Sequence, residues 1–307
     1  MTGTTARRPV RMRILKLVLC SLLLVVLGAC AATPAASSTE ASVGERIGVR
    51  SGGLDRSYLV RVPERERGER LPVVIALHGV GGNAQDFEDW TRITDSVDKD
   101  RFIAVYPDGS LLRDDRQVWN AAGCCTSAGS RPANDVAFLT GILDALPAYG
   151  GDPSRVYVAG FSNGGMMTYR LACEVGNRIA GIAVVAGALN VTSCPTMNPM
   201  PVVIIHGTAD DTVPYAGGTT PTAQELGIQG VPNASVSDAV KFWAGRDGCA
   251  PTGRTTTSGS VHHERFTQCT APGSRMDVYT IDGGAHTWTT NDGEMDMTDV
   301  ILDAFIR

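Results

Sequence analysis

The sequence lacks an apolar run long enough to cross a membrane as a helix. Its longest such run, residues 17–27, is only about half of the roughly 20 residues that a bilayer requires. Residues 1–29 also hold five basic groups and no acid. A basic stretch followed by a short apolar run is typical of a secretory signal. We therefore expect residues 1–29 to be an export signal rather than a transmembrane segment.

A basic surface for nucleic acid is also missing. The chain has 27 basic and 32 acidic side chains, a formal charge of −5, and without residues 1–29 the balance is 22 against 32, or −10. Binding to a phosphate backbone needs clustered Lys and Arg, so we expect no nucleic-acid partner. Gly and Pro are spread along the chain and 43% of the residues are hydrophobic, which excludes collagen-like and wholly disordered chains.

No cysteine has the spacing of a zinc site, and no metal or nucleotide site is indicated elsewhere, so we expect no cofactor. Cys30 follows Leu27, Gly28 and Ala29, an arrangement that resembles a bacterial lipobox, in which the cysteine becomes the lipidated first residue. Residues 30–43 then form the lipidated Cys30 and a flexible tether. The alternative is an ordinary cleaved signal with an incidental cysteine. An anchor of this kind is the only membrane contact that we expect.

Six further cysteines remain in the exported chain, and an even number in an oxidising compartment predicts disulfides. The preferred pairs are Cys173 with Cys194 and Cys249 with Cys269, because each closes a short loop. The adjacent Cys124 and Cys125 would then form a vicinal bridge or remain as two free thiols.

After the tether, apolar strands alternate with helical patterns, which predicts an α/β domain with a mainly parallel central sheet flanked by helices. No repeat and no second domain boundary is visible, so residues 44–307 are expected to form one catalytic domain. A stretch without period, residues 110–133, is expected to be a loop. The expected strands are residues 46–50, 58–62, 72–77, 102–106, 156–159, 182–185, 202–206, a segment around Arg265, and 276–281. The expected helices follow Asn83, with Phe87, Trp90, Ile93 and Val97 at helical spacing, and cover residues 134–146, 166–174, 235–244 and 297–306.

Gly160-x-Ser162-x-Gly164 lies between an apolar strand and a helix. A serine on such a turn projects its hydroxyl outward from a strained backbone, which only small neighbours allow. The pattern alone is weak in a glycine-rich chain, where it could be a turn without chemistry. Its strand–turn–helix context predicts a nucleophile at Ser162.

A serine nucleophile needs a base, and the base needs an acid to orient it. His286 follows the strand at 276–281 in a glycine-rich loop, and Asp210 follows the strand at 202–206. The order Ser162, Asp210, His286 is that of α/β-hydrolases. Asp211 is the second choice of acid and Asp282 the third. The remaining histidines are expected at turns or on the surface: His78, His206, His262 and His263.

The third requirement is a pocket that stabilises an oxyanion. Residues 77–83, Leu-His-Gly-Val-Gly-Gly-Asn, follow an early strand like the HGGG-type loop that supplies one backbone N–H. We expect the amides of Val80 and Asn163 to form this pocket.

Five segments in order resemble the polyhydroxybutyrate-depolymerase-type esterases, a group similar to the feruloyl and acetylxylan esterases of carbohydrate esterase family 1 and including actinobacterial lipoprotein esterases. They are residues 77–87, 118–125, 160–165, 206–214 and 283–288. The resemblance spans residues 44–307. It departs at Val80, often Cys in the family, at Ala285, often Gly, and at Thr289, often Pro.

The resemblance implies a single-domain α/β-hydrolase fold and a secreted serine esterase that uses Ser162, His286 and Asp210. Trp119 and Trp288 are candidate walls of the substrate cleft, with a place in the core as the equal alternative for each. The absence of a separate surface-binding domain favours small or polymer-linked esters, such as hydroxycinnamoyl or acetyl groups on polysaccharide. An acyltransferase of the mycolyltransferase type with the same triad is the alternative, and a non-catalytic binding lipoprotein is a third reading. The sequence alone leaves the ester and the oligomeric state open.

Overall fold

Ten strands of the described residues form one mixed sheet, in the order β1-β2-β4-β3-β7-β8-β9-β12-β11-β10. The computed structural model describes residues 44–111, 116–122, 124–125, 133–195, 198–219, 232–290 and 295–307. The strands are β1 (Glu45–Ser51), β2 (Leu54–Arg61), β3 (Leu71–Leu77), β4 (Ile103–Pro107), β7 (Gly151–Phe161), β8 (Gly181–Val185), β9 (Val202–Gly207), β10 (Arg254–Ser258), β11 (Val261–Phe266) and β12 (Met276–Ile281). From β4 to β12 every neighbouring pair is parallel, and the pairs at both ends of the sheet are antiparallel.

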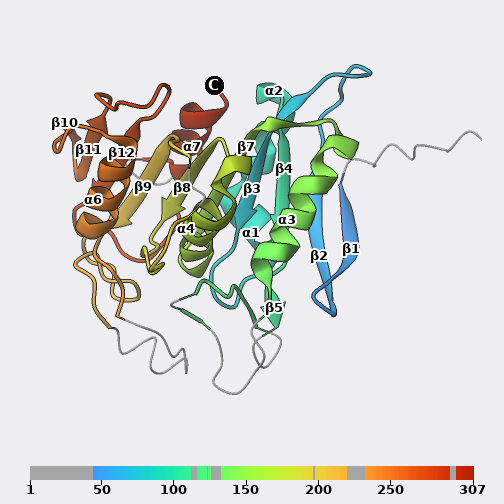
Figure 1. Cartoon of the computed structure of the whole chain (residues 1–307), viewed down its shortest axis with the longest axis horizontal. Helices are drawn as coiled ribbons and strands as arrows, with labels where there is room; N and C mark the ends of the chain where they lie inside the picture. The colour runs from blue at the N-terminus through green and yellow to red at the C-terminus, as the bar shows by residue number, and fades with distance from the viewer. Residues whose placement is uncertain are drawn as a thin grey trace, which may run out of the picture. The chain divides into compact units, whose positions relative to one another are not determined.

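Helices cover both faces of this sheet (Figure 1). Alternate residues of β3 enter different cores: Val73, Ile75 and Leu77 pack in one cluster, and Val74 and Ala76 in the other. The first cluster includes residues of α3 (Asp135–Ala145), α4 (Asn163–Val175) and α6 (Val236–Asp247), and the second includes residues of α1 (Ala84–Thr91) and α7 (Met297–Phe305). A strand buried on both sides explains the continuous apolar runs of the sequence.

The expected α/β class, with a mainly parallel sheet flanked by helices in a single domain, is confirmed. The export signal at residues 1–29, the tether at 30–43 and its Cys30 lie outside the described residues. Within the described residues, no helix has the length and apolarity needed to span a bilayer.

Three local expectations differ from the structure. Residues 254–258 form β10, which the sequence hides because its side chains are polar and exposed on both faces. The expected loop at 110–133 contains a two-stranded ribbon, β5 (Ser110–Leu111) paired with β6 (Gln117–Val118). Helix α1 ends where Arg92 adopts a left-handed conformation, φ 55°, so the helical spacing from Phe87 to Val97 is broken into α1, a 3₁₀ turn at Ile93–Ser96 and the short α2 (Val97–Asp100).

The structure pairs the six described cysteines as Cys173–Cys194, Cys249–Cys269 and the vicinal Cys124–Cys125. The first two are the preferred sequence pairs. The third takes the bridged alternative rather than the two free thiols.

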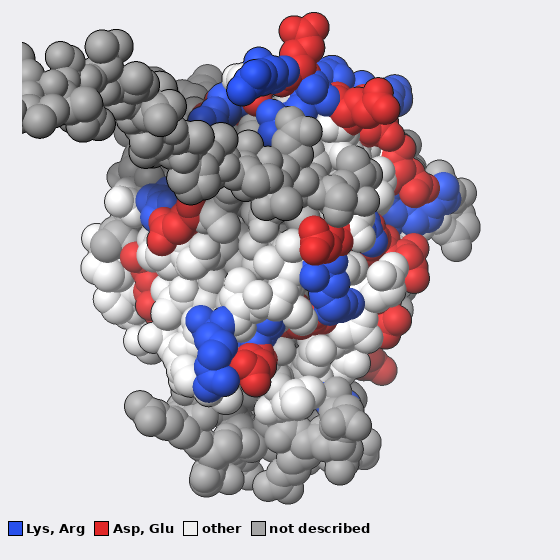
Figure 2. Space-filling model, turned by 90° about the vertical axis from the view of Figure 1, so that its right-hand side faces the viewer, with Lys and Arg blue, Asp and Glu red and all other residues white. Residues whose placement is uncertain are grey.

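Charged side chains on the β1–β2 edge lie in pairs of opposite sign (Figure 2). Arg50 contacts Asp55 at 3.1 Å with both side chains exposed, and Arg46 contacts Asp108. A buried pair lies below them, where Arg56 Nη1 is 2.8 Å from Asp135 Oδ1 and the two side chains are 3% and 0% exposed. Asp135 Oδ2 also accepts from the Asn120 amide at 2.7 Å, and the Arg56 guanidinium lies 4.0 Å from the Phe138 ring centroid. This buried pair therefore connects β2, α3 and the segment that follows β6.

Neutralising Asp135 is expected to destabilise the fold far more than neutralising Asp55. Asp135→Asn leaves the Arg56 charge buried without its counter-ion, which costs about 3–5 kcal/mol of the free energy of unfolding. Asp55→Asn is the matched control, since its pair with Arg50 is solvated and worth little. Chemical denaturation of both variants measures the difference, and equal losses would contradict this account.

Asp247, at the end of α6, has a buried carboxyl group whose ionised form is disfavoured by the loss of water around it. It is 1% exposed, and burial raises its pKa to about 6, against smaller opposing effects of the Met200 backbone and Arg246. The folded state therefore holds the Asp247 proton more tightly than the unfolded chain does.

The sign of the resulting pH effect follows from linkage. The contribution of Asp247 to stability is present below its ordinary pKa and is lost as the pH rises through about 6. Asp247→Asn should remove this loss, so the variant gains stability relative to the wild type across that interval. Urea unfolding at a series of pH values measures the difference, with Asp144→Asn, an exposed carboxylate on α3, as control. A difference independent of pH would refute the assignment.

Candidate active site

The predicted site residues lie at one edge of the sheet, where the parallel strands end. Ser162 follows β7, Asp210 follows β9 and His286 follows β12, while Val80 lies in the turn after β3. The carboxyl ends of parallel strands meet at the same edge, which is where open α/β sheets bind their ligands.

Ser162 lies between β7 and α4 with φ 56° and ψ −120°. A positive φ is uncommon for a residue with a side chain, and this one is held by close packing around it. The Ser162 amide donates to the Val185 carbonyl at 2.9 Å, and a Cβ on Gly164 would collide with the carbonyl of Leu77. The serine is thus held on a strained turn that a larger residue at position 164 would open.

The side chains of Ser162, His286 and Asp210 form a hydrogen-bonded relay. His286 Nε2 is 2.9 Å from Ser162 Oγ, and His286 Nδ1 is 2.7 Å from Asp210 Oδ2. An ionised carboxylate only accepts, so Nδ1 carries a proton and the neutral ring leaves Nε2 free to accept from the serine hydroxyl. This is the tautomer that lets an imidazole take a proton from serine.

The carboxylate of Asp210 is buried and fully engaged. Burial disfavours its charge, but hydrogen bonds from His206 and His286 and from the Val213 amide hold its pKa well below the usual range. Oδ1 accepts from the amides of Thr212 at 2.9 Å and Val213 at 2.7 Å. Asp210 therefore stays ionised well below the pH at which a carboxyl group ordinarily takes up a proton.

The turn after β3 lies directly beside the serine. A Cβ on Gly79 would be 3.3 Å from the Cβ of Ser162, so the next residue, Val80, is close to the nucleophile. His78 braces this turn: Nδ1 lies 2.7 Å from the Gly79 carbonyl and Nε2 accepts from the Gly109 amide at 2.9 Å. Burial lowers the pKa of His78, which favours the neutral ring that can both donate and accept. Its role is the turn-stabilising one expected from the sequence.

The two tryptophans expected at the cleft are buried instead. Trp119 is 0% exposed and its Nε1 donates to the His78 carbonyl at 2.9 Å, while Trp288 is 1% exposed and its Nε1 donates to Thr298 Oγ1 at 3.0 Å. Indole rings without accessible surface cannot stack on a substrate. The structure therefore corrects this expectation and assigns both rings to packing.

Asn163, directly after the serine, fastens the Trp119 segment to α4. Its Oδ1 accepts from the Trp119 amide at 2.7 Å and its Nδ2 donates to the Trp119 carbonyl at 2.9 Å. Nδ2 also lies 3.9 Å from Cys124 Sγ. These side-chain bonds help to fix the position of Asn163, whose own backbone amide is expected to face the oxyanion.

An aromatic contact at the site was missed in the sequence. The Phe161 ring lies between His286 and Trp90, with centroid distances of 4.8 Å and 4.9 Å. Trp90 is 40% exposed, although it shares the helical spacing of the buried Phe87. No sequence signal marks this exposed position within α1.

The other candidate residues lie away from the relay. Asp211 is exposed and accepts from Thr212 Oγ1, and Asp282 is 2.8 Å from His262 Nε2 rather than from His286. His263 stacks on Tyr279 and contacts Asp277. His206 is the exception, because it contacts both Val213 and Asp210.

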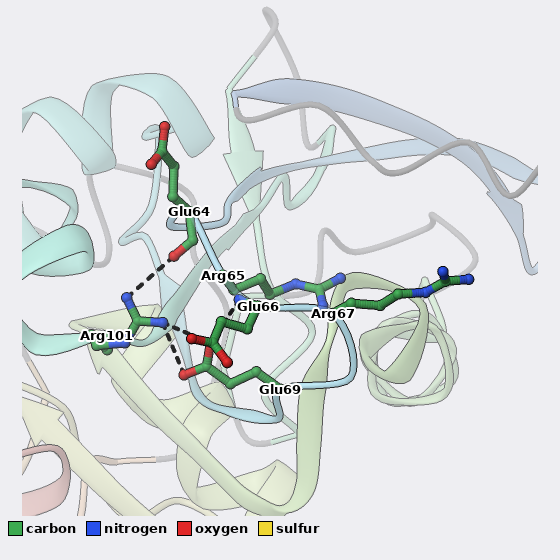
Figure 3. A pocket seen from close by; sticks show the side chains of 6 residues that line it. All are labelled: Glu64, Arg65, Glu66, Arg67, Glu69 and Arg101. Carbon is green, nitrogen blue, oxygen red and sulfur yellow. Dashed lines mark hydrogen bonds and ion pairs between the residues drawn. The ribbon is translucent and has the colours of Figure 1, made fainter.

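Two pockets of the described part of the chain differ in character. One, of about 280 Å³, lies beside the histidine loop, with Ala285 and Thr287 and the apolar side chains of Val261, Ile281 and Met297 among its walls. The other, of about 760 Å³, is lined by charged residues that precede β3 and β4, so it lies at the opposite edge of the sheet (Figure 3). There Arg101 binds both carboxylate oxygens of Glu69. Within the described residues no group of His, Cys, Asp or Glu is placed to hold a metal.

Comparison with known proteins gives matches in sequence and in fold. The family model described as Esterase PHB depolymerase matches residues 56–179, which include the turn after β3 and Ser162 but not Asp210 or His286. The chain is 29% identical over 247 residues to feruloyl esterase B of Piromyces equi, covering 78% of this chain and 44% of that protein. It is 32% identical over 234 residues to esterase NocK of Nocardia uniformis subsp. tsuyamanensis, covering 72% of this chain and 66% of that protein.

Solved structures show the fold. The acetyl xylan esterase from Aspergillus awamori superposes with a TM-score of 0.60 at 15% identity, covering 86% of this chain and 99% of that one. An S-formylglutathione hydrolase from Agrobacterium tumefaciens gives 0.52 at 12% identity, covering 80% and 89%. These neighbours confirm the α/β-hydrolase fold expected from the order of the motifs.

Neutralising Asp210 should slow the reaction of Ser162 with a fluorophosphonate by about 10⁴-fold, the loss in kcat when the orienting carboxylate of such a relay becomes an amide. Asp210→Asn keeps the shape but can turn an N–H toward His286 and reverse its tautomer. Asp211→Asn, one residue away and exposed, is the matched control and should label at the wild-type rate. Intact-mass spectrometry over time measures both rates. Equal rates for Asp210→Asn and wild type would exclude Asp210 as the acid.

Proposed function

We propose that this chain, which belongs to the Esterase PHB depolymerase family, is a carboxylic ester hydrolase that works through an acyl-enzyme at Ser162. The observation that carries the proposal is the relay of 2.9 Å and 2.7 Å that joins Ser162, His286 and Asp210 on the strained turn after β7. The family relatives support the same chemistry, since the two compared above are named as esterases.

The first half of the reaction forms the acyl-enzyme. Ser162 Oγ bonds to the ester carbonyl carbon as its proton passes to His286 Nε2, and the carbonyl electron pair moves onto oxygen. The amides of Val80 and Asn163 stabilise that oxyanion. The tetrahedral intermediate then expels the alcohol, which takes the proton from His286.

The second half repeats these steps with water. Water gives a proton to His286 as its oxygen bonds to the acyl carbon, and the same amides hold the second oxyanion. Collapse breaks the bond to Ser162 Oγ, which recovers its proton from His286, and the carboxylic acid leaves. The ionised Asp210 stabilises the His286 cation in both halves without taking its proton.

The proposed substrates are esters on plant-type polysaccharide, with hydroxycinnamoyl or acetyl as the acyl group. Relatives named feruloyl esterase B and bifunctional acetylxylan esterase/xylanase support this class. The three disulfides support an oxidising compartment and hence export. We extend the proposal to a signal at residues 1–29 and a lipid anchor at Cys30, which would place the domain at residues 44–307 on the outer face of the cell membrane.

The wild-type protein should release free acid from methyl ferulate, acetylated xylan or short p-nitrophenyl esters, and Ser162→Ala should lower kcat by on the order of 10⁶-fold. Ser154→Ala, a serine outside the site, is the control. Chromatography of the products, with polyhydroxybutyrate film as a further substrate, identifies the ester that is preferred. A Ser162→Ala protein as active as wild type would contradict the proposed nucleophile.

The same assay with trehalose present distinguishes hydrolysis from acyl transfer. Free acid as the acyl product in both conditions supports the hydrolase, whereas a trehalose ester would identify a transferase. A wild-type protein that neither turns over any of these esters nor labels with a fluorophosphonate would be a binding protein instead.

A further inference from the structure

We propose that His206 is a positioning residue for the catalytic acid: its Nε2–H holds the Asp210 carboxylate in the rotation and charge state that His286 requires. This inference rests on the proposed function, because it assigns His206 a part in the same relay. Sequence patterns indicated only a turn-stabilising histidine at this position.

The proton on His206 can be assigned from its contacts. His206 is 2% exposed at the end of β9, and its Nε2 lies 2.8 Å from the Val213 carbonyl and 3.2 Å from Asp210 Oδ2. A carbonyl and an ionised carboxylate both only accept, so Nε2 must donate to them. The single Nε2–H of His206 is thus shared between the Asp210 carboxylate and the Val213 carbonyl, which lie at the two ends of the same loop.

Both oxygens of the Asp210 carboxylate have hydrogen-bond donors around them. Oδ1 takes the amides of Thr212 and Val213, and Oδ2 faces the two imidazoles of His206 and His286. The amides fix one oxygen, but a carboxylate held at one oxygen can still tilt the other. The donor from His206 supplies a point of fixation at this second oxygen, in addition to the bond from His286.

The loop that carries Asp210 is also bonded to the loop that carries His286. A rotation of the Asp210 side chain therefore cannot be compensated by a movement of one loop against the other. The Ala209 amide donates to the Gly284 carbonyl at 3.0 Å, and a Cβ on Gly207 would collide with that carbonyl. Because the two backbones are in contact, the 2.7 Å bond from His286 to Asp210 depends on the side-chain rotation of Asp210 rather than on loop movement.

His206 also shares the negative charge of Oδ2. The groups that face it are Asp210, the Tyr215 ring at 5.9 Å edge-on, and Thr280, its partner in β12, whose Oγ1 binds the Tyr215 hydroxyl. Tyr215 and Asp210 are thus the titratable groups in contact with His206, and Asp210 in turn contacts His286. Removing the donor leaves a more basic carboxylate against His286, which stabilises the imidazolium and moves the acid limb of the pH–rate profile to higher pH.

Three substitutions separate this role from packing. His206→Phe removes the donor, His206→Gln returns an N–H at nearly the same reach, and His206→Asn keeps a polar group that is too short. With p-nitrophenyl acetate, His206→Phe and His206→Asn should lower kcat with little change in KM. We expect a loss on the order of 10- to 100-fold, the range found when side chains that orient metal ligands by hydrogen bonds are removed. Both variants should move the acid limb of the pH–rate profile to higher pH. His206→Gln should restore the wild-type kcat and the wild-type position of the acid limb. Tyr215→Phe, which keeps the ring beside His206 but loses its hydroxyl, is the control and should match wild type.

The outcomes are distinct. A lower kcat in His206→Phe and His206→Asn, with recovery in His206→Gln, supports the positioning role. His206→Asn keeps the comparison valid if His206→Phe fails to fold. Equal losses in all three variants, or a lower melting temperature with an unmoved acid limb, would assign His206 to packing and overturn the inference. A wild-type protein with no Ser162-dependent esterase activity would instead overturn the proposed function.

Discussion

The strained backbone at Ser162 is the constraint on which the rest of the site depends. A residue with a side chain at φ 56° is unfavourable by itself, and the surrounding structure must hold it there. It does so because α4 begins against the end of β3, with no room for a methyl group on Gly164. The same contact that strains the serine brings the turn of Val80 beside it. The positions of the proposed nucleophile and of the expected oxyanion donors thus both depend on one close packing of helix on strand.

A second constraint is electrostatic. Asp210 is buried, and a buried carboxylate is tolerated only where donors compensate for lost water. Two backbone amides and two imidazoles provide this compensation, which keeps the carboxylate ionised and directed at His286. The exposed pair of Arg50 and Asp55 on the β1–β2 edge follows the opposite rule, since water already solvates both side chains. Burial, rather than the count of charges, decides which of the ion pairs in this chain matter.

Much of this arrangement could be predicted from the sequence because it depends on short-range signals. Continuous apolar runs identified the parallel strands, and glycines beside Ser162 and before His286 identified the loops at their ends. Chain order then placed Asp210 in the relay, and the structure brings these three side chains together.

The parts that could not be predicted depend on distant partners. In the sequence nothing distinguishes Trp119 and Trp288 from tryptophans that line a cleft. Their neighbours in space bury both side chains. Trp90 fits a helical period that ends one residue later, where Arg92 leaves the helix. His206 has no local pattern that distinguishes a turn residue from a partner of Asp210, since its contacts arise only when the loop closes back to Val213. Polar β10 exists because β11 offers it a pairing edge.

Asn163, next to Ser162, is bonded to a part of the chain 44 residues earlier. Its side-chain amide pairs with the backbone of Trp119 on both the N–H and the C=O, as a neighbouring strand would. The position of the first turn of α4 is therefore set partly by the segment after β6. At Trp119 the backbone is therefore constrained as it would be in a core strand, although it lies outside the sheet.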